Sequence, residues 1–138
     1  MRIGLAYAME EEIASLLADT GAKHLETARG VSVYEIEPGI LAYAGGVGKV
    51  NAAMSAQYFI DRYQPDWIVN AGVAGSFHDL PIGTVVLAED FVQHDIDTSA
   101  VDGVLGLIPT LKLTSLPTDQ PDRAGAILTG LGVAFERG

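Results

Sequence analysis

Apolar and polar residues follow two different periods at the start of the chain. Residues 3–8 form a short, continuous apolar run, which predicts a strand buried on both faces of a sheet. Ile13, Leu16 and Leu17 then follow at helical spacing, and Gly21 is a residue type that ends helices. We therefore expect a buried strand followed directly by an amphipathic helix.

A hairpin is predicted next. Residues 31–37 alternate between apolar and polar, as in a half-exposed strand, and residues 40–44 form the returning strand after a Pro-Gly turn. The polar stretch at residues 23–30 is predicted to be a loop or an edge strand. The first part of the chain is therefore expected to have the order βαββ.

The middle of the chain predicts a second helix and two further strands. The helix runs from the loop at residues 45–51 to about Tyr63, before a Gln-Pro stop. Residues 66–71 are predicted as another buried strand and residues 84–93 as a long one. The helical positions that we expect to be buried are Val50, Ala53, Met54, Ile60 and Tyr63.

One more helix and a strand are predicted near the end. Thr118 or Asp119 is expected to cap a helix that begins near Pro121, and residues 133–136 begin a strand. The apolar positions of this helix are Ala124, Ile127, Leu128 and Leu131. Residues 1–138 are interpreted as a single α/β domain.

Three segments suited to ligand binding follow predicted strands. They are Glu10-Glu-Glu12, Gly45-Gly-Val-Gly-Lys-Val-Asn51 and Gly72-Val-Ala-Gly-Ser76. In an open α/β sheet, ligands bind beyond the carboxyl ends of the strands. Each segment has a plainer alternative, because acids are favoured in any first helical turn and glycine loops are often only tight connections. Their convergence on one sheet edge favours a ligand site.

The glycine loop at residues 45–51 matches neither common phosphate-binding motif. Counting back from Gly48-Lys49, Tyr43 stands where the Walker A motif requires its first glycine. Val50 stands where that motif requires a Ser or Thr for magnesium. Asn51 takes the place of the third glycine of the dinucleotide fingerprint.

Composition narrows the function classes. The chain has 138 residues, with 8 basic against 18 acidic residues and a net charge of −10. Nucleic-acid and anionic-membrane surfaces need clustered Lys and Arg, so neither partner is expected. The chain has no cysteine, and we find no signal peptide and no apolar run of membrane-spanning length. A cytoplasmic protein is the expectation.

Metal binding is not expected. His94, Asp95 and Asp97 lie close together, but His24 and His78 lie in loop-like sequence without ligand spacing. The cluster is interpreted as a cap that hydrogen-bonds a neighbouring loop or a ligand.

Four motifs together carry a resemblance to a known family. They are Ile3-Gly-Leu-Ala-Tyr-Ala-Met-Glu-Glu-Glu12, Gly45-Gly-Val-Gly-Lys-Val-Asn-Ala-Ala53, Asn70-Ala-Gly-Val-Ala-Gly75 and His94-Asp-Ile-Asp97. In order and spacing the chain resembles the 5′-methylthioadenosine/S-adenosylhomocysteine nucleosidases, of the purine nucleoside/uridine phosphorylase family. The resemblance implies a nucleoside phosphorylase-like, three-layer α/β/α fold with a mixed central sheet, truncated after the last predicted helix. It also implies a homodimer, a nucleoside substrate and no cofactor.

The implied activity is hydrolysis of the N-glycosidic bond of an adenine nucleoside that bears a 5′-thio group. By its place in the motif, Glu12 corresponds to the acid that activates the attacking water, and a carboxylate is suited to this role beside an oxocarbenium-like transition state. Carboxylates here would repel phosphate, so water is the expected nucleophile. The residues that the resemblance implies for substrate binding are Met9, Gly46, Val47, Gly48, Val73, Ala74, Gly75, Ile108 and Pro109.

The chain departs from the family pattern at three places. Tyr7 stands where a small residue is common, and Val73 stands where a serine is frequent. The chain also ends at Gly138, before the base-recognition region, the ribose-binding Met-Glu segment and the aspartate that protonates the purine. We therefore expect an N-terminal fragment that is nearly inactive alone, because adenine is a poor leaving group without an acid. A nucleoside phosphorylase of the same fold and a non-catalytic binding module are the alternatives.

Overall fold

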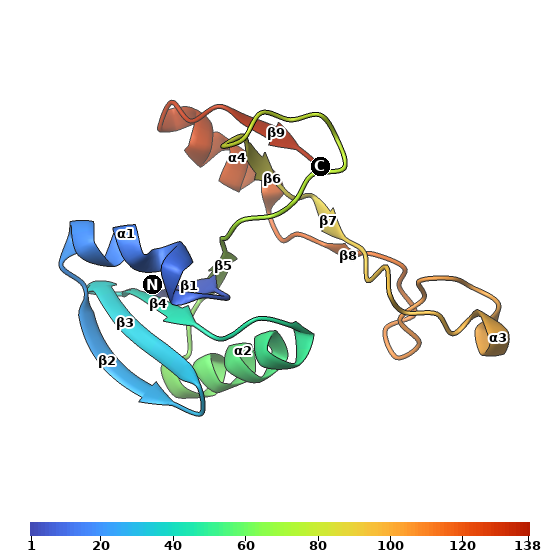
Figure 1. The fold of residues 1–138 in the computed structure, drawn as a ribbon, viewed down its shortest axis with the longest axis horizontal. Coiled ribbons are helices and arrows are strands. Elements are labelled where there is room, and N and C mark those ends of the chain that lie inside the picture. Colours follow the sequence, from blue (N-terminus) through green and yellow to red (C-terminus); the bar gives the residue numbers. More distant parts are fainter. The chain divides into compact units, whose positions relative to one another are not determined.

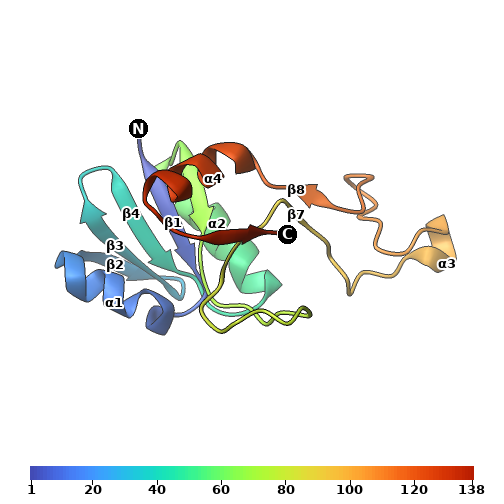
Figure 2. The same ribbon diagram turned by 90° about the horizontal axis from the view of Figure 1, so that it is seen from above.

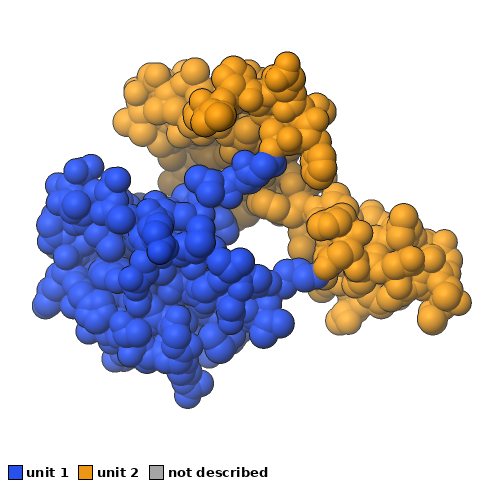
Figure 3. Space-filling model, in the orientation of Figure 1, with its two compact units in different colours: residues 1–75 blue, residues 76–138 orange. Residues whose placement is uncertain are grey.

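The computed structural model describes the backbone of residues 1–138 and every side chain except that of Asp102. The chain divides into two compact units, residues 1–75 and residues 76–138 (Figure 3). The expected single domain stays a prediction. In the first unit the elements are β1 (Ile3–Tyr7), α1 (Glu10–Thr20), β2 (Lys23–Ala28), β3 (Val31–Glu37), β4 (Ile40–Ala44), α2 (Lys49–Tyr63) and β5 (Trp67–Asn70).

The first unit is built on a five-stranded sheet with the order β2-β3-β4-β1-β5. β1 runs parallel to both β4 and β5, with Leu5 opposite Ala42 on one side and Val69 on the other. β2, β3 and β4 pair in antiparallel fashion. Figures 1 and 2 show β1 beside β4 within this sheet. The predicted mixed sheet and the predicted βαββ start, with residues 23–28 as an edge strand, are confirmed.

The two helices cover opposite faces of this sheet (Figure 1). Phe59 of α2 is fully buried against β3 and β4 side chains on one face, including Val33 and Tyr43. Side chains alternate across a strand, so Tyr34 points to the other face, where its hydroxyl donates to Glu10 of α1 at 3.1 Å. The first unit therefore has the predicted three layers, helix, sheet and helix.

Two glycines let α2 lie close to the sheet. A Cβ on Gly4 would lie 2.4 Å from a ring carbon of Phe59, and one on Gly45 would lie 2.2 Å from Ser55 Oγ. Phe59 and Ser55 are consequently the buried residues of α2.

The predicted burial of α2 was wrong at most positions. The exposed fractions of Val50, Met54 and Ile60 are 83%, 41% and 43%. Ala53 is also exposed, and Tyr63 packs partly against the core. The helix docks through the face that fits the glycines of β1 and β4, and this face includes a serine that apolar periodicity cannot detect.

β5 is less buried than predicted. It pairs with β1 alone among the described strands, so it forms an edge of the sheet. Ile68 and Val69 are 38% and 47% exposed. The prediction assumed a central strand with a neighbouring strand on each side, whereas β5 has a neighbour on one side.

The second unit contains short strands. β6 (Val85–Leu87) runs parallel to β9 (Phe135–Arg137), and β7 (Asp90–Phe91) pairs in antiparallel fashion with β8 (Leu116–Pro117). The helices are α3 (Ser99–Asp102) and α4 (Pro121–Gly130).

The long strand predicted at residues 84–93 was wrong, because it breaks at Glu89. The Glu89 N–H donates to the carbonyl of Gly138 at 2.6 Å, and its own carbonyl accepts from the Thr118 N–H at 2.8 Å. The Glu89 carboxylate also pairs with Arg137 at 2.7 Å. The chain therefore changes pairing partner at this residue.

The start of α4 at Pro121 is confirmed, but the predicted cap was wrong. Gln120 is the cap residue, in a left-handed conformation with φ of 50° and without a side-chain capping bond. The backbone N–H of Thr118 instead donates a hydrogen bond to the Glu89 carbonyl. Ile127 and Leu131, two of the expected apolar positions, are 55% and 72% exposed, and Gly125 is the buried residue of α4.

Candidate active site

The loops that follow three neighbouring parallel strands meet at one edge of the sheet. The Gly45 N–H donates to the Tyr7 carbonyl at 3.0 Å, and the Gly46 N–H donates to the Ala8 carbonyl at 2.8 Å. On the other side of β1, the Ala71 N–H donates to the Ala6 carbonyl at 3.1 Å. The parallel pairing thus continues beyond the ends of β4, β1 and β5. The convergence expected from the sequence is present, and we call this edge the rim.

Glu12 joins two of these loops. Its Oε2 accepts the backbone N–H groups of Ala8 and Met9, each at 3.0 Å, and its Oε1 accepts the N–H of Val73 at 3.2 Å. Ala8 and Met9 precede α1, whereas Val73 follows β5. The contact with Met9 is also what a helix-capping glutamate makes, so the capping interpretation of the sequence holds locally. The bond to Val73 goes beyond capping, because it comes from another strand.

These hydrogen bonds favour the ionised form of Glu12. The N–H groups of Met9 and Val73 do most to stabilise the carboxylate and lower its pKa below the ordinary value. Burial opposes them in part, and the N–H of Ala8 adds a smaller lowering effect. Burial and the charge of Glu12 in turn raise the pKa of the Tyr7 hydroxyl. A carboxylate that is charged at neutral pH can accept a proton and can face a developing positive charge.

The other two acids of the first helical turn lie elsewhere. Glu10 accepts a hydrogen bond from the hydroxyl of Tyr34, and its pKa is lowered mainly by the side chains of Ser32 and Tyr34. Glu11 is exposed. Of the three, Glu12 is the one whose carboxylate bridges the loops of the rim.

The glycine loop between β4 and α2 is shaped by its backbone. Gly46 and Gly48 have φ angles of 90° and 100°, a conformation that favours glycine. The Asn51 side chain donates to the Val47 carbonyl at 2.8 Å and fixes the loop. Val47 itself is 65% exposed. This role of Asn51 was not predicted from the sequence, although an amide in the first turn of a helix is well suited to such a bond.

The remaining predicted residues fall into two groups. Val73, Ala74 and Gly75 are exposed on the loop after β5, within the first unit. Ile108 and Pro109 belong to the second unit, where the Ile108 N–H donates to the Leu113 carbonyl at 2.8 Å in a tight turn. Their part in a substrate site stays a prediction.

The acidic cluster near residue 95 has a local structural role. The carboxylate of Asp97 accepts the backbone N–H of Ser99 at 3.0 Å and its hydroxyl at 2.6 Å, just before α3. Within the described residues, no group of three or more His, Asp or Glu side chains is arranged to hold a metal ion. In the same part of the chain, no helix has the length and apolarity to cross a membrane.

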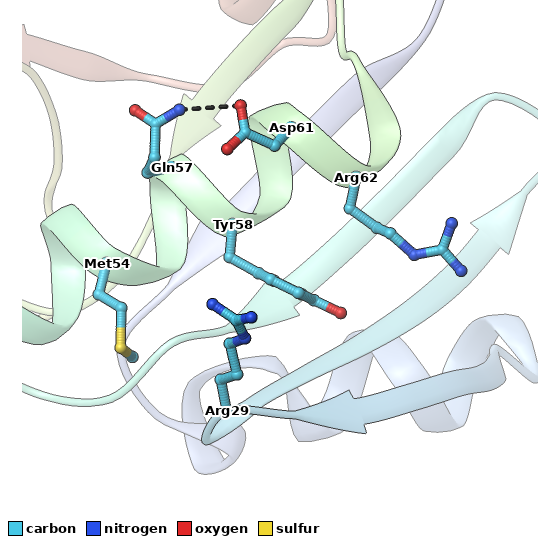
Figure 4. A pocket seen from close by; sticks show the side chains of 6 residues that line it. All are labelled: Arg29, Met54, Gln57, Tyr58, Asp61 and Arg62. Atoms are coloured by element: carbon cyan, nitrogen blue, oxygen red, sulfur yellow. Dashed lines mark hydrogen bonds between the residues drawn. The ribbon is translucent and has the colours of Figure 1, made fainter.

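A hollow of about 440 Å³ lies against α2, and none of the predicted site residues belongs to its lining (Figure 4). Within it, the Gln57 amide donates to the Asp61 carboxylate at 2.9 Å. Beside it, Glu26 of β2 accepts from the hydroxyls of Tyr58 and Tyr63 and pairs with Arg62, so these residues tie α2 to the sheet. The residues that line the hollow are Arg29, Met54, Gln57, Tyr58, Asp61 and Arg62.

Comparison with known proteins identifies the family. The profile of the Phosphorylase superfamily matches residues 2–120, and the chain belongs to this superfamily. Among curated relatives, the 5′-methylthioadenosine/S-adenosylhomocysteine nucleosidase of Bacillus subtilis (strain 168) is 38% identical over 120 residues. That match covers 80% of this chain and 50% of the relative. The chain spans about half the length of the curated relatives it matches.

Comparison with solved structures also finds similarity to nucleosidases of this kind. The 5′-methylthioadenosine/S-adenosylhomocysteine nucleosidase from Helicobacter pylori, crystallised with butyl-thio-DADMe-Immucillin-A, matches with a TM-score of 0.89 at 28% identity. The match covers 100% of this chain and 62% of that one. The native futalosine hydrolase of the same organism matches with a TM-score of 0.88 at 27% identity, with the same two coverages. The predicted nucleoside phosphorylase-like fold is confirmed.

Proposed function

We propose that this chain supplies the water-activating side of an N-glycosidic hydrolase that acts on 5′-methylthioadenosine and S-adenosylhomocysteine and releases adenine. The observation that carries the proposal is the Glu12 carboxylate, which accepts three backbone N–H groups from two loops at the rim. The names of the curated relatives support the choice of substrate.

The chemistry follows from the position of this carboxylate. A water molecule donates one proton to Glu12 while its oxygen forms a bond to C1′ of the ribose. The bond from C1′ to N9 breaks, and the electron pair leaves with adenine, which must gain a proton. The negative charge of Glu12 also stabilises the positive charge that develops on the sugar. In the family that the chain resembles, the acid that protonates adenine belongs to a part of the fold that residues 1–138 do not include.

Water is favoured over phosphate as the nucleophile. The turn that carries Glu12 holds three consecutive carboxylates, and the chain has a net charge of −10. A phosphate dianion would be repelled at this turn, whereas a neutral water molecule would not. The phosphorylase alternative requires a cationic group here, and none belongs to this turn.

The proposal extends to the setting of the enzyme. We expect a homodimer that works in the cytoplasm in methionine salvage. Val47 and Val50 support a protein partner, because these apolar side chains are 65% and 83% exposed beside the rim.

The identity of the nucleophile tests the proposal. A suitable substrate is p-nitrophenyl 5-methylthioriboside, because its leaving group departs as a stabilised anion and needs no acid. In water enriched in oxygen-18 and containing inorganic phosphate, we expect 5-methylthioribose that carries one solvent oxygen at C1, at a rate independent of phosphate. The product is identified by mass spectrometry.

Two outcomes would contradict the proposal. Formation of 5-methylthioribose 1-phosphate would establish the phosphorylase alternative. A folded chain that cleaves the substrate no faster than buffer does would favour a binding module. The matched control is the same incubation with 5-methylthioribose, which shows how much label enters the product by exchange after cleavage.

A further inference from the structure

The carboxylate of Glu12 lies directly against Gly72. A Cβ placed on Gly72 would lie 2.8 Å from Oε1, 3.4 Å from Cδ and 3.6 Å from Oε2 of Glu12. Real Cβ atoms do not approach another heavy atom as closely as 2.8 Å. The φ angle of Gly72 is not in the left-handed region, so the backbone would accept an alanine. An alanine at this position would therefore meet no strain from its own backbone, but it would displace the Glu12 carboxylate.

The hydrogen bonds of Glu12 leave one acceptor position open to a ligand. A carboxylate offers about four lone-pair positions. Oε2 accepts two N–H groups, from Ala8 and Met9, and Oε1 accepts one, from Val73. The remaining position is therefore on Oε1, the oxygen that lies nearest to Gly72.

We propose that Gly72 is a positioning residue, which seats the Glu12 carboxylate between two loops and leaves Oε1 as the atom that accepts the proton of the attacking water. That the proton comes from the attacking water rests on the proposed function. The position of the Glu12 carboxylate against Gly72 rests on the contacts alone. Gly72 acts through Glu12. A methyl group at this position would push the carboxylate away from the Val73 N–H and disturb the side of Oε1 that faces the water.

Titration of Glu12 tests this role. The carboxyl carbon of Glu12 is followed by carbon-13 NMR and assigned with a Glu12→Gln variant. In the unaltered chain the pKa measured for Glu12 should lie below the ordinary glutamate pKa. The chemical shift of the Val73 amide proton should follow the same titration curve. In Gly72→Ala, we expect the midpoint to rise toward the ordinary value and the Val73 amide to stop following it. Tyr7 of β1 is the titratable neighbour whose pKa the charge of Glu12 affects, and its own titration lies at much higher pH.

Gly75→Ala is the matched control. Gly75 lies on the same loop, its φ angle is not left-handed, and nothing lies within 4 Å of the Cβ that an alanine would add. The Glu12 titration in Gly75→Ala should equal that of the unaltered chain. An unchanged Glu12 midpoint in Gly72→Ala, with the Val73 amide still following it, would overturn the proposal.

A second measurement covers the case in which Gly72→Ala unfolds. The substitution should lower the thermal unfolding midpoint of the unaltered chain but leave that of Glu12→Ala unchanged, because the clashing carboxylate is then absent. An equal loss in both backgrounds would show a merely structural glycine. Neither measurement uses a substrate, so a failure of nucleoside cleavage with a shifted Glu12 titration would overturn the proposed function and leave the role of Gly72 standing.

Discussion

Replacing Glu12 by glutamine should slow cleavage of p-nitrophenyl 5-methylthioriboside by about 100-fold to 10,000-fold, the usual contribution of a general base. Glutamine keeps the size of the side chain and one oxygen that can accept from a backbone N–H. It cannot take the proton of water at neutral pH, and it carries no charge to face the sugar cation. Steady-state release of p-nitrophenolate measures the effect.

Glu11→Gln is the control for this variant. Glu11 stands in the same helical turn and is exposed, so the substitution removes the same formal charge without touching the rim. We expect its rate to stay within about two-fold of the unaltered chain, because exposed charges are well screened by water. Equal losses in both variants would mean that general electrostatics, and not a positioned base, accounts for the rate.

The pH dependence of the rate follows from the sign of the Glu12 shift. The backbone N–H groups stabilise the carboxylate and lower its pKa, so the base stays ionised to a lower pH than an ordinary glutamate would. The acid limb of the rate profile should therefore lie below the ordinary value of about 4.3. A limb well above that value would mean that burial outweighs the hydrogen bonds.

Removing the ring of Phe59 should be the most damaging single change to the first unit. Phe59 is fully buried and stacks on Tyr43, with ring centroids 4.5 Å apart, and on Tyr63 at 5.1 Å. Truncation of a buried phenylalanine to alanine costs about 3–5 kcal/mol, from lost burial and the cavity that remains. Denaturant unfolding followed by Trp67 fluorescence reports on this unit, since Trp67 lies in β5 and is the one tryptophan of the chain.

Ile60→Ala is the matched control for Phe59→Ala. Ile60 is the next residue on the same helix and is 43% exposed, so its truncation should cost much less than that of Phe59. The opposite order of the two variants would show that α2 docks through the face predicted from the sequence.

The elements that position the site were predictable because each is encoded locally. The apolar run at residues 3–8 and the glycine-rich segments after two later strands are visible in a single short window. Parallel pairing of such strands then brings their carboxyl ends to one edge, as observed for β4, β1 and β5. Glu12 was found in this way, although its partner Val73 is 61 residues distant in sequence.

The features that sequence reasoning missed depend on contacts between distant elements. Gly72 looked like an ordinary turn glycine, because the carboxylate that it accommodates comes from α1. The buried face of α2 is set by Gly4 and Gly45, which make room for Phe59 and Ser55. The strand break at Glu89 depends on backbone partners at both Thr118 and Gly138. None of these partners is visible within one window.

If the rim formed by the three loops is the nucleoside site, an amide NMR footprint of the bound nucleoside should fall on it. Addition of 5′-methylthioadenosine to the labelled chain should shift the amides of Met9, Val47, Gly48 and Val73 with one common saturation curve. A saturable footprint on the hollow lined by Arg29 and Arg62, with unchanged rim amides, would show that the rim is not the nucleoside site. So would a folded chain whose rim amides show no saturable shift.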